Sequence, residues 1–494
     1  MKRHLALLLL ALAGACASPP ARQSALDRIE TIVVIYAENH SFDNMYGMFP
    51  GANGVANASA VATQQRDHDG RPLPSLPPVY SNGKVDPDYP KGLPNGPFRI
   101  EAPPVSRTID DIVPNPIHAY FHNREQIDGG RNDLFVAMSD RGAWAMGYYD
   151  GSHQRVWQWA KRYTLMDNFF MGAFGGSFLN HHWLICACTP EWRDAPASIR
   201  AQLDGNGRLK RRPASPASVM DGPVQVFDGQ VTPDGYAVNT SQPPYQPSGL
   251  PPASADRLDY ADPAKLPVPP QTAKTIGDTL SAKGIGWVWY AGGWNAALAD
   301  GRRPASEKRA VIYDRSRKTP MFQPHHQPFN YYARFAPGTA DRARHLKDGE
   351  DFLKAIDAGT LPPVAFYKPD GQLNQHPSYT DIHSGDIHIA DVLARLEKSP
   401  QWPHMLVIVT YDENGGYWDH VPPPTGEGWG DRWGPGSRIP TIVVSPFAKQ
   451  GFVDHTAYDT TSILKLITER FALEPLPGVR RNMGDLTNAL APPP

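Results

Sequence analysis

The chain has 494 residues, and its 48 Lys and Arg nearly balance its 50 Asp and Glu, for a formal net charge of -2. This balance excludes the strongly basic surface by which a protein holds a nucleic-acid backbone. The length allows one large domain or two smaller ones. Its 52 prolines and 43 glycines favour long ordered loops over a helical bundle.

Residues 1–17 have the pattern of an export signal, with a basic start and an apolar run too short to span a membrane as a mature helix. Cys16 after Ala-Gly-Ala fits a lipoprotein signal, whose lipidated cysteine would attach the protein to a membrane. Ala15 and Ala17 also fit ordinary signal cleavage. Both readings predict an exported protein, periplasmic, anchored to the outer membrane or secreted. We expect residues 27–494 to form one domain.

The first predicted strand is Thr31–Tyr36, an apolar and β-branched run, and Glu38 and Asn39 follow it. The alternative for these polar residues is a turn in which Ser41 caps a helix, and both readings can hold together. Residues 50–115 contain no confident element and are expected to run over the surface. Residues 131–150 are predicted to be helical.

The second informative stretch is Gly175-Gly176-Ser177, which precedes an apolar helix predicted over Phe178–Cys188. Ser177 would therefore lie near a helix N-terminus, where free N–H groups favour anions. The commoner explanation of such a serine is an ordinary N-cap. Cys186 and Cys188 are separated by one residue, which is poor geometry for a disulfide between them, particularly on a helix, and both are predicted to be buried apolar residues.

Proline-rich residues 190–270 are expected to form an insertion or cap over the catalytic face. Beyond them helices and strands alternate, which predicts a mainly parallel sheet covered on both faces. The predicted helices are Ile276–Lys283, Gly349–Ala358, Ile387–Lys398 and Thr460–Phe471, and the predicted strands are Gly286–Tyr290, Pro363–Tyr367, Leu406–Thr410 and Arg438–Ser445.

The strand Leu406–Thr410 leads into Asp412 and Glu413, two adjacent carboxylates before a Gly-Gly turn. Taken alone, such a pair favours an exposed loop. If this strand lies parallel to Thr31–Tyr36, however, its acids meet Glu38 at one edge of the sheet. A divalent cation would then offset the cost of burying neighbouring anions.

Histidines in proline-bounded loops support phosphate chemistry, because neutral histidine binds metals and protonated histidine donates to phosphate oxygens or to a leaving group. By contrast, His122, His181 and His404 are predicted to be solvated or structurally satisfied. The residues expected at the phosphoryl group are His118, His325, His326 and His376.

Four motifs together resemble the bacterial acid phosphatase and phospholipase C family of the alkaline phosphatase superfamily. They are Glu38-Asn39-His40-Ser41-Phe42-Asp43, Gly175–His181, His376-Pro377 and Tyr411–Val421. The resemblance spans about residues 31–471. It implies a three-layer α/β/α sandwich and a metal-dependent phosphoester hydrolase.

The resemblance also implies roles for single residues. One divalent cation would be held by Glu38, Asn39, Ser177, Asp412 and Glu413, with Ser177 as the nucleophile and one of the four histidines as the general acid. Glu413 stands where some family members have a second Asp. We expect a broad-specificity acid phosphatase first, a phospholipase C second, and a surface lipoprotein that binds phosphorylated ligands without turnover third.

Overall fold

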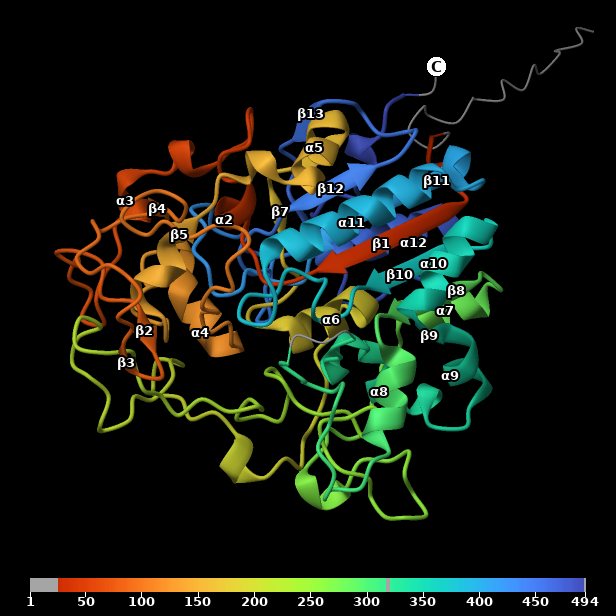
Figure 1. Ribbon diagram of the computed structural model, residues 1–494, viewed down its shortest axis with the longest axis horizontal. Helices are drawn as coiled ribbons and strands as arrows, with labels where there is room; N and C mark the ends of the chain where they lie inside the picture. Colours follow the sequence, from red (N-terminus) through yellow and green to blue (C-terminus); the bar gives the residue numbers. More distant parts are fainter. Residues whose placement is uncertain (1–24, 317–319, 493–494) are drawn as a thin grey trace, which may run out of the picture.

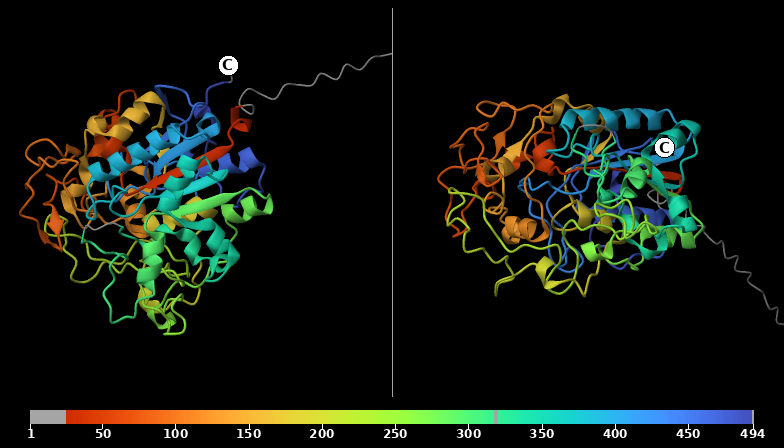
Figure 2. Two further views of the ribbon diagram at one scale, coloured as in Figure 1. Left: turned by 45° about the vertical axis from the view of Figure 1, so that its right-hand side comes forward. Right: turned by 60° about the horizontal axis from the view of Figure 1, so that its bottom comes forward.

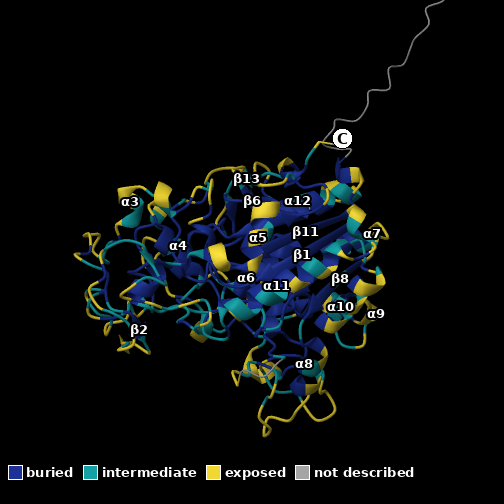
Figure 3. Cartoon of the chain, turned by 45° about the horizontal axis from the view of Figure 1, so that its top comes forward, coloured by how far each residue is buried: buried dark blue, intermediate teal, exposed yellow. Residues whose placement is uncertain are grey.

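The computed structural model describes residues 25–316 and 320–492. The export signal predicted over residues 1–17 and its Cys16 lie outside the described residues. Among the helices that are described, none has the length and apolar character needed to cross a membrane. The chain folds around a central sheet that runs through the interior, with exposed residues gathered on the surrounding loops and outer helix faces (Figure 3).

The central sheet has eight strands in the order β13-β6-β12-β11-β1-β10-β8-β9. The pairs on either side of β1 are parallel, whereas β12 is antiparallel to both of its neighbours. The strands are β1 Thr31–Ala37, β6 Thr164–Met166, β8 Trp287–Ala291, β9 Leu346–Asp348, β10 Val364–Lys368, β11 Met405–Tyr411, β12 Thr441–Val444 and β13 Phe452–Asp454.

All seven residues of β1 and all seven of β11 are buried, as expected for central strands that are covered on both faces. Helices α5 and α11 pack together on one face of the sheet, and α6 and α12 pack together on the other (Figures 1 and 2). The predicted α/β/α sandwich with a mainly parallel sheet is confirmed. The helices that cover the sheet are α5 Arg155–Arg162, α6 Ser177–Cys186, α7 Ile276–Ala282, α9 Ala340–His345, α10 Gly349–Ala358, α11 Ile382–Glu397 and α12 Thr460–Phe471.

Shorter helices and strands lie within the long loops. They are α2 Phe42–Tyr46, α3 Ala60–Thr63, α4 Tyr120–Ile127, α8 Trp294–Gly301, β2 Tyr80–Ser81, β3 Lys84–Val85, β4 Phe98–Arg99, β5 Gly147–Tyr148, β7 Phe169–Phe170 and β14 Tyr458–Asp459. Residues 190–270 form extended loops with two single 3-10 turns, at Ala197–Ile199 and Pro263–Lys265. These loops run along the lower part of the molecule in Figure 1.

The helix predicted over residues 131–150 is wrong. A local side-chain bond competes with a helix there, because the Ser139 hydroxyl accepts from the Arg141 N–H. The next residue, Asp140, accepts from the distant Ile117 N–H. Gly142 then has a φ of +54°. Only a 3-10 turn over Gly142–Met146 forms, followed by β5.

The prediction that the two cysteines form no disulfide with each other is also wrong, because Cys186 and Cys188 are bonded, although Cys186 is buried as predicted. Helix α6 ends at Cys186, and Ala187 adopts a left-handed conformation with φ 47° and ψ 43°. This residue takes the chain out of the helix, so the unfavourable helical geometry that we assumed for the pair does not apply.

Candidate functional site

The parallel register of β1 and β11 brings the two predicted acidic strand ends together. Ala37 lies opposite Tyr411, so Glu38 and Asp412 leave the sheet side by side. The Asn39 N–H donates to Asp412 Oδ1 at 3.0 Å. Glu38, Asn39, Asp412 and Glu413 are all fully buried. The exposed-loop reading of the acidic pair therefore does not hold.

The two turns after these strands interlock. Asn39 has a φ of 60°, a left-handed conformation that asparagine tolerates better than most residues. Gly415 has a φ of +64°, and a Cβ there would lie 2.1 Å from the Asn39 carbonyl oxygen. Only glycine allows this approach. Ser41 also caps α2 by accepting from the Asn44 N–H, so the capping and site readings of this turn hold together.

Ser177 reaches the same place from α6. Its Oγ lies 3.2 Å from Glu38 Oε2 and 3.4 Å from Asn39 Oδ1. Ser177 is the first residue of α6, and Gly176 is the N-cap, so the serine is not the ordinary N-cap that we weighed against catalysis. Its hydroxyl is free to face the acids at the end of the sheet.

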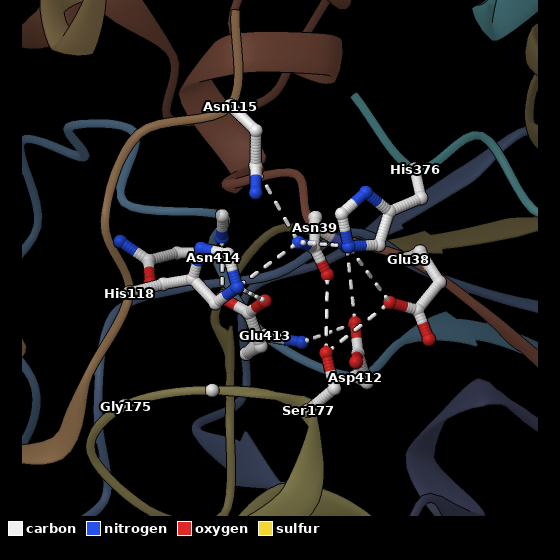
Figure 4. A network of polar contacts seen from close by, with 12 residues as sticks. Glu38, Asn39, Asn115, His118, Gly175, Ser177, His376, Asp412, Glu413 and Asn414 are labelled. Carbon is white, nitrogen blue, oxygen red and sulfur yellow. Dashed lines mark hydrogen bonds and ion pairs between the residues drawn. The ribbon is translucent and has the colours of Figure 1, made fainter. Parts of the chain in front are cut away.

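His118 and His376 contact the Asn39 side chain from two sides (Figure 4). Backbone carbonyls lie 2.7 Å from His118 Nδ1 and 2.6 Å from His376 Nδ1. A carbonyl only accepts, so both Nδ1 atoms hold the proton in the neutral rings. Each Nε2 then accepts from the Asn39 amide, at 3.3 and 3.1 Å respectively. Both rings thus turn Nε2 toward the carboxylates.

His325 and His326 complete the predicted histidine set from a 3-10 turn at Pro324–His326. His326 Nε2 lies 2.9 Å from Glu38 Oε1. The His325 ring contacts that of His326 at 4.5 Å, and its Nδ1 lies 3.2 Å from the Tyr313 hydroxyl. The structure therefore brings together all nine predicted site residues. His325 packs against His326, and His326 in turn contacts Glu38.

Of two further titratable residues at the site, Lys368 was missed from the sequence, and His181 was predicted to be only solvated or structurally satisfied. Lys368, at the end of β10, forms a buried ion pair with Glu38, and its Nζ lies 3.3 Å from the Ala37 carbonyl oxygen. His181 is buried, stacks on His326 and lies 3.9 Å from Asp412 Oδ2. Their positions in the sequence could have indicated them, because Lys368 follows a predicted parallel strand and His181 lies one helical turn after Ser177.

The buried charges do not balance without a further cation. Three carboxyl groups, those of Glu38, Asp412 and Glu413, face one ammonium group, that of Lys368, so ionisation of all three would leave two negative charges uncompensated. Burial and the Glu38 charge raise the pKa of Asp412 to about 8. Burial and the Asp412 charge raise the pKa of Glu413 well above its usual value.

A divalent cation fits this deficit and also the unsatisfied atoms. Asp412 Oδ2 and Glu413 Oε1 are buried and accept no hydrogen bond from the described residues. Buried oxygens of this kind are rare without a partner. Glu38, His181 and His326 also form a group whose ligand atoms lie within 4.8 Å of one another. Carboxylate and amide oxygens suit a hard cation, and imidazole suits a borderline one.

Burial also sets the charge of the histidines. It lowers the pKa of His376 to about 3 and the pKa of His118 below its usual value. The pKa of Glu38 is held well below normal: burial opposes ionisation, but His326 and Lys368 outweigh it. The site without substrate therefore holds an ionised Glu38 among neutral imidazoles.

A second group of potential ligands, Asp43, Asp419 and His420, is already paired with an arginine. Arg438 is fully buried, with Nε 2.7 Å from Asp419 Oδ1 and Nη2 3.1 Å from Asp43 Oδ1. Its Nη1 donates to the Asp167 carbonyl at 2.6 Å. His420 Nδ1 also lies 2.6 Å from Asp43 Oδ2, so this group is an ion-pair network that fixes the loop after β11.

A cavity of about 570 Å³ opens beside the site. Its lining includes His118, Gly176, Phe178, Arg315 and Tyr379. The remaining wall includes residues 228–230 and 238–240, which belong to the predicted 190–270 insertion. The insertion thus contributes directly to the cavity next to the candidate site.

Comparisons with known proteins agree with this geometry. The sequence model of the Phosphoesterase family matches residues 29–474. Phospholipase C B of Mycobacterium tuberculosis (strain ATCC 25618 / H37Rv) is 23% identical, over 95% of this chain and 79% of its own length. Phospholipase C A of the same strain is 26% identical, over 94% of this chain and 77% of its own length.

Among solved structures, a protein in the alkaline phosphatase superfamily from Vibrio parahaemolyticus is 10% identical, covers 77% of this chain and 74% of its own, and has a TM-score of 0.32. At that score the assignment to a family rests on the sequence match.

Proposed function

Because the chain belongs to the Phosphoesterase family, it is a hydrolase of phosphoric esters, and we propose that its substrates are phospholipids. The reaction would be that of a phospholipase C, which releases diacylglycerol and a phosphorylated head group. Sequence reasoning placed acid phosphatase first and phospholipase C second. The relatives over nearly the whole chain are named phospholipases C, which reverses that order.

One divalent cation would be held by Glu38, Asn39, Ser177, Asp412 and Glu413. The support is the deficit of two charges and the unsatisfied oxygens of Asp412 and Glu413. When bound, the cation would lower the pKa of the Ser177 hydroxyl and offset negative charge on the phosphoryl group.

Ser177 is the proposed nucleophile. Its Oγ forms a bond to phosphorus while the bond from phosphorus to the diacylglycerol oxygen breaks, which leaves the head-group phosphate esterified to the serine. Water then attacks phosphorus in this phosphodiester, the bond to Ser177 Oγ breaks, and the phosphorylated head group leaves as the hydroxyl is regenerated. The observation that carries the proposal is the position of Ser177 Oγ, 3.2 Å from Glu38 Oε2 at the start of α6.

The leaving oxygen needs a proton, and a histidine at the site would supply it. His118 and His376 are the best placed, because backbone carbonyls occupy their Nδ1 atoms and both Nε2 atoms face the site. Burial disfavours the imidazolium form in the site without substrate, but the negative charge of a bound phosphate would favour it, and either ring would then donate from Nε2. His326 is held by Glu38, which suits a supporting role.

The discriminating experiment compares turnover of phosphatidylcholine vesicles and of p-nitrophenyl phosphate by the same metal-loaded preparation. We expect a higher kcat/KM on the lipid and loss of both activities after chelation. Faster turnover of p-nitrophenyl phosphate would restore acid phosphatase as the main activity. No turnover of either substrate, with binding retained, would favour the non-catalytic lipoprotein.

We also propose that the protein is exported, on the basis of the signal pattern over residues 1–17. Radiolabelled palmitate supplied to expressing cells separates the two cleavage readings. Label in the wild type and none in Cys16→Ala supports a lipoprotein. An unlabelled wild-type protein in the periplasm or medium would support ordinary signal cleavage.

A further inference from the structure

Among the described residues that line the cavity beside the site, one charged side chain has no charged partner. Asp140 pairs with Arg141 at 3.4 Å. Asp228 lies 3.3 Å from His122 Nδ1 and accepts from the Asn239 amide. Arg315, in contrast, has no carboxylate partner among the described residues, although its side chain is exposed and lines the same cavity.

Arg315 is nevertheless held in place. Its Nη2 donates to the Tyr379 hydroxyl at 3.2 Å, and its Cζ lies 4.5 Å from the centre of the Tyr379 ring. The Tyr379 ring in turn stacks on His376, with centroids 4.1 Å apart and an interplanar angle of 22°. A continuous stack thus leads from the guanidinium to the histidine that contacts Asn39.

This placement defines what Arg315 can bind. A guanidinium presents five N–H donors in a fork that matches the paired oxygens of a carboxylate or phosphate. Among the described residues, only one of these donors has a hydrogen-bond partner. The Tyr379 ring stands between Arg315 and His376, so the guanidinium is one aromatic ring further out than the groups expected at the reacting phosphate.

We propose that Arg315 and Tyr379 form a subsite for a second anionic group on the substrate, a carboxylate in the first instance, separate from the phosphate that reacts. This inference rests on the proposed function and deepens it. It predicts a preference for phosphoesters that have such an anion a few bonds from the reacting phosphate. Tyr379 orients Arg315 through its ring and hydroxyl.

Two substrate pairs that differ by one carboxylate test the subsite. They are phosphoserine against phosphoethanolamine, and phosphatidylserine against phosphatidylethanolamine. The wild type is expected to favour the serine member of each pair it hydrolyses. In Arg315→Gln this preference, measured as a ratio of kcat/KM values, should fall about tenfold and mainly through KM.

Further variants separate charge from geometry. Arg315→Lys keeps the charge without the planar fork and should give an intermediate ratio. Tyr379→Phe keeps the stack and loses the hydroxyl, so a smaller decrease is expected. Arg257→Gln is the matched control, because Arg257 is exposed, lies 4.5 Å from the Tyr260 ring and is outside the cavity lining. Its ratio should equal that of the wild type.

A binding measurement keeps this inference distinguishable from the proposed function. In a Ser177→Ala background, calorimetry should show weaker phosphoserine binding after Arg315→Gln, with a smaller change for phosphoethanolamine. That result would support the subsite even if the wild type hydrolysed none of the four substrates. The proposed function would then be refuted while the subsite stood. Equal ratios and equal binding in Arg315→Gln and wild type would overturn the subsite.

Discussion

Lys368 forms an ion pair with Glu38 in the interior of the protein, at the end of the central sheet. The Lys368 side chain is 1% exposed and the Glu38 side chain 0%. Glu38 lies next to Asp412 and Glu413, so Lys368 is the only ammonium group among the described residues of the site that offsets their charge. Its removal should therefore affect stability as well as any cation.

We expect Lys368→Met to lower the free energy of unfolding of the chelated protein by about 3–5 kcal/mol, since it leaves a buried carboxylate unpaired. Added divalent cation should recover part of this loss. Urea unfolding with and without chelator measures both effects. Lys354→Met is the control: Lys354 pairs with Glu350 at the surface, and such pairs contribute about 0–1 kcal/mol. A Lys368 variant as stable as the control would contradict the charge argument.

Ser177→Ala should reduce kcat for phosphoester turnover by on the order of 10⁴-fold or more, because it removes the proposed nucleophile. The cavity left by one hydroxyl is small, so the circular dichroism spectrum and unfolding midpoint should stay close to those of the wild type. A denatured variant would not be informative, which is why both measurements accompany the kinetics. Turnover at the wild-type rate would exclude Ser177 from the reaction.

Arg438→Met should lower the free energy of unfolding by about 3–5 kcal/mol, since Asp43 and Asp419 would remain buried without their guanidinium. Arg395→Met provides the comparison: its pair with Asp357 is exposed, and we expect a loss below about 1 kcal/mol. If divalent cations fully restored the stability of Arg438→Met, Asp43 and Asp419 would be a latent metal site after all. Urea unfolding in EDTA and in added metal makes the distinction.

The burial of His182 predicts that the folded protein loses stability in acid. Burial lowers its pKa from 6.5 to about 3, so the unfolded chain binds a proton on this ring at a higher pH than the folded protein does. The stability due to the neutral ring is complete above pH 6.5 and is lost progressively as the pH falls toward 3.

His182→Gln removes this term. Between pH 6 and 4, the decrease in unfolding free energy should be about 1.4 kcal/mol per pH unit smaller in the variant than in the parent. Denaturant titrations at several pH values measure the slope. Identical slopes in the two proteins would mean that His182 is protonated in the folded state, and would refute the burial argument.

The sequence predicted best those helices and strands whose capping residues and apolar pattern favour the same structure as their packing in the fold. The predicted bounds of α10 and α12 match the structure, and each helix begins with a capping box. The predicted strand Thr31–Tyr36 matches β1 to within one residue. It could be recognised because a strand buried on both faces needs a continuous apolar run.

The failures share a different cause. The spacing of Cys186 and Cys188 was judged on helical geometry, and the left-handed Ala187 between them was not foreseen. Residues 131–150 have apolar spacing suited to a helix, but Ser139 and Asp140 bond the backbone instead. Lys368 was missed because a strand pattern does not tell which way its last long side chain points.

The place of β1 in the sheet has a consequence for how the protein is made. This strand is the first of the described strands to leave the ribosome, yet its two neighbours, β10 and β11, begin at Val364 and Met405. Until most of the chain has been synthesised, both edges of an apolar strand stay without their partners, a state prone to aggregation. We expect the nascent chain to depend on chaperones that bind extended apolar segments, and enzymatic activity to emerge only when synthesis is nearly complete.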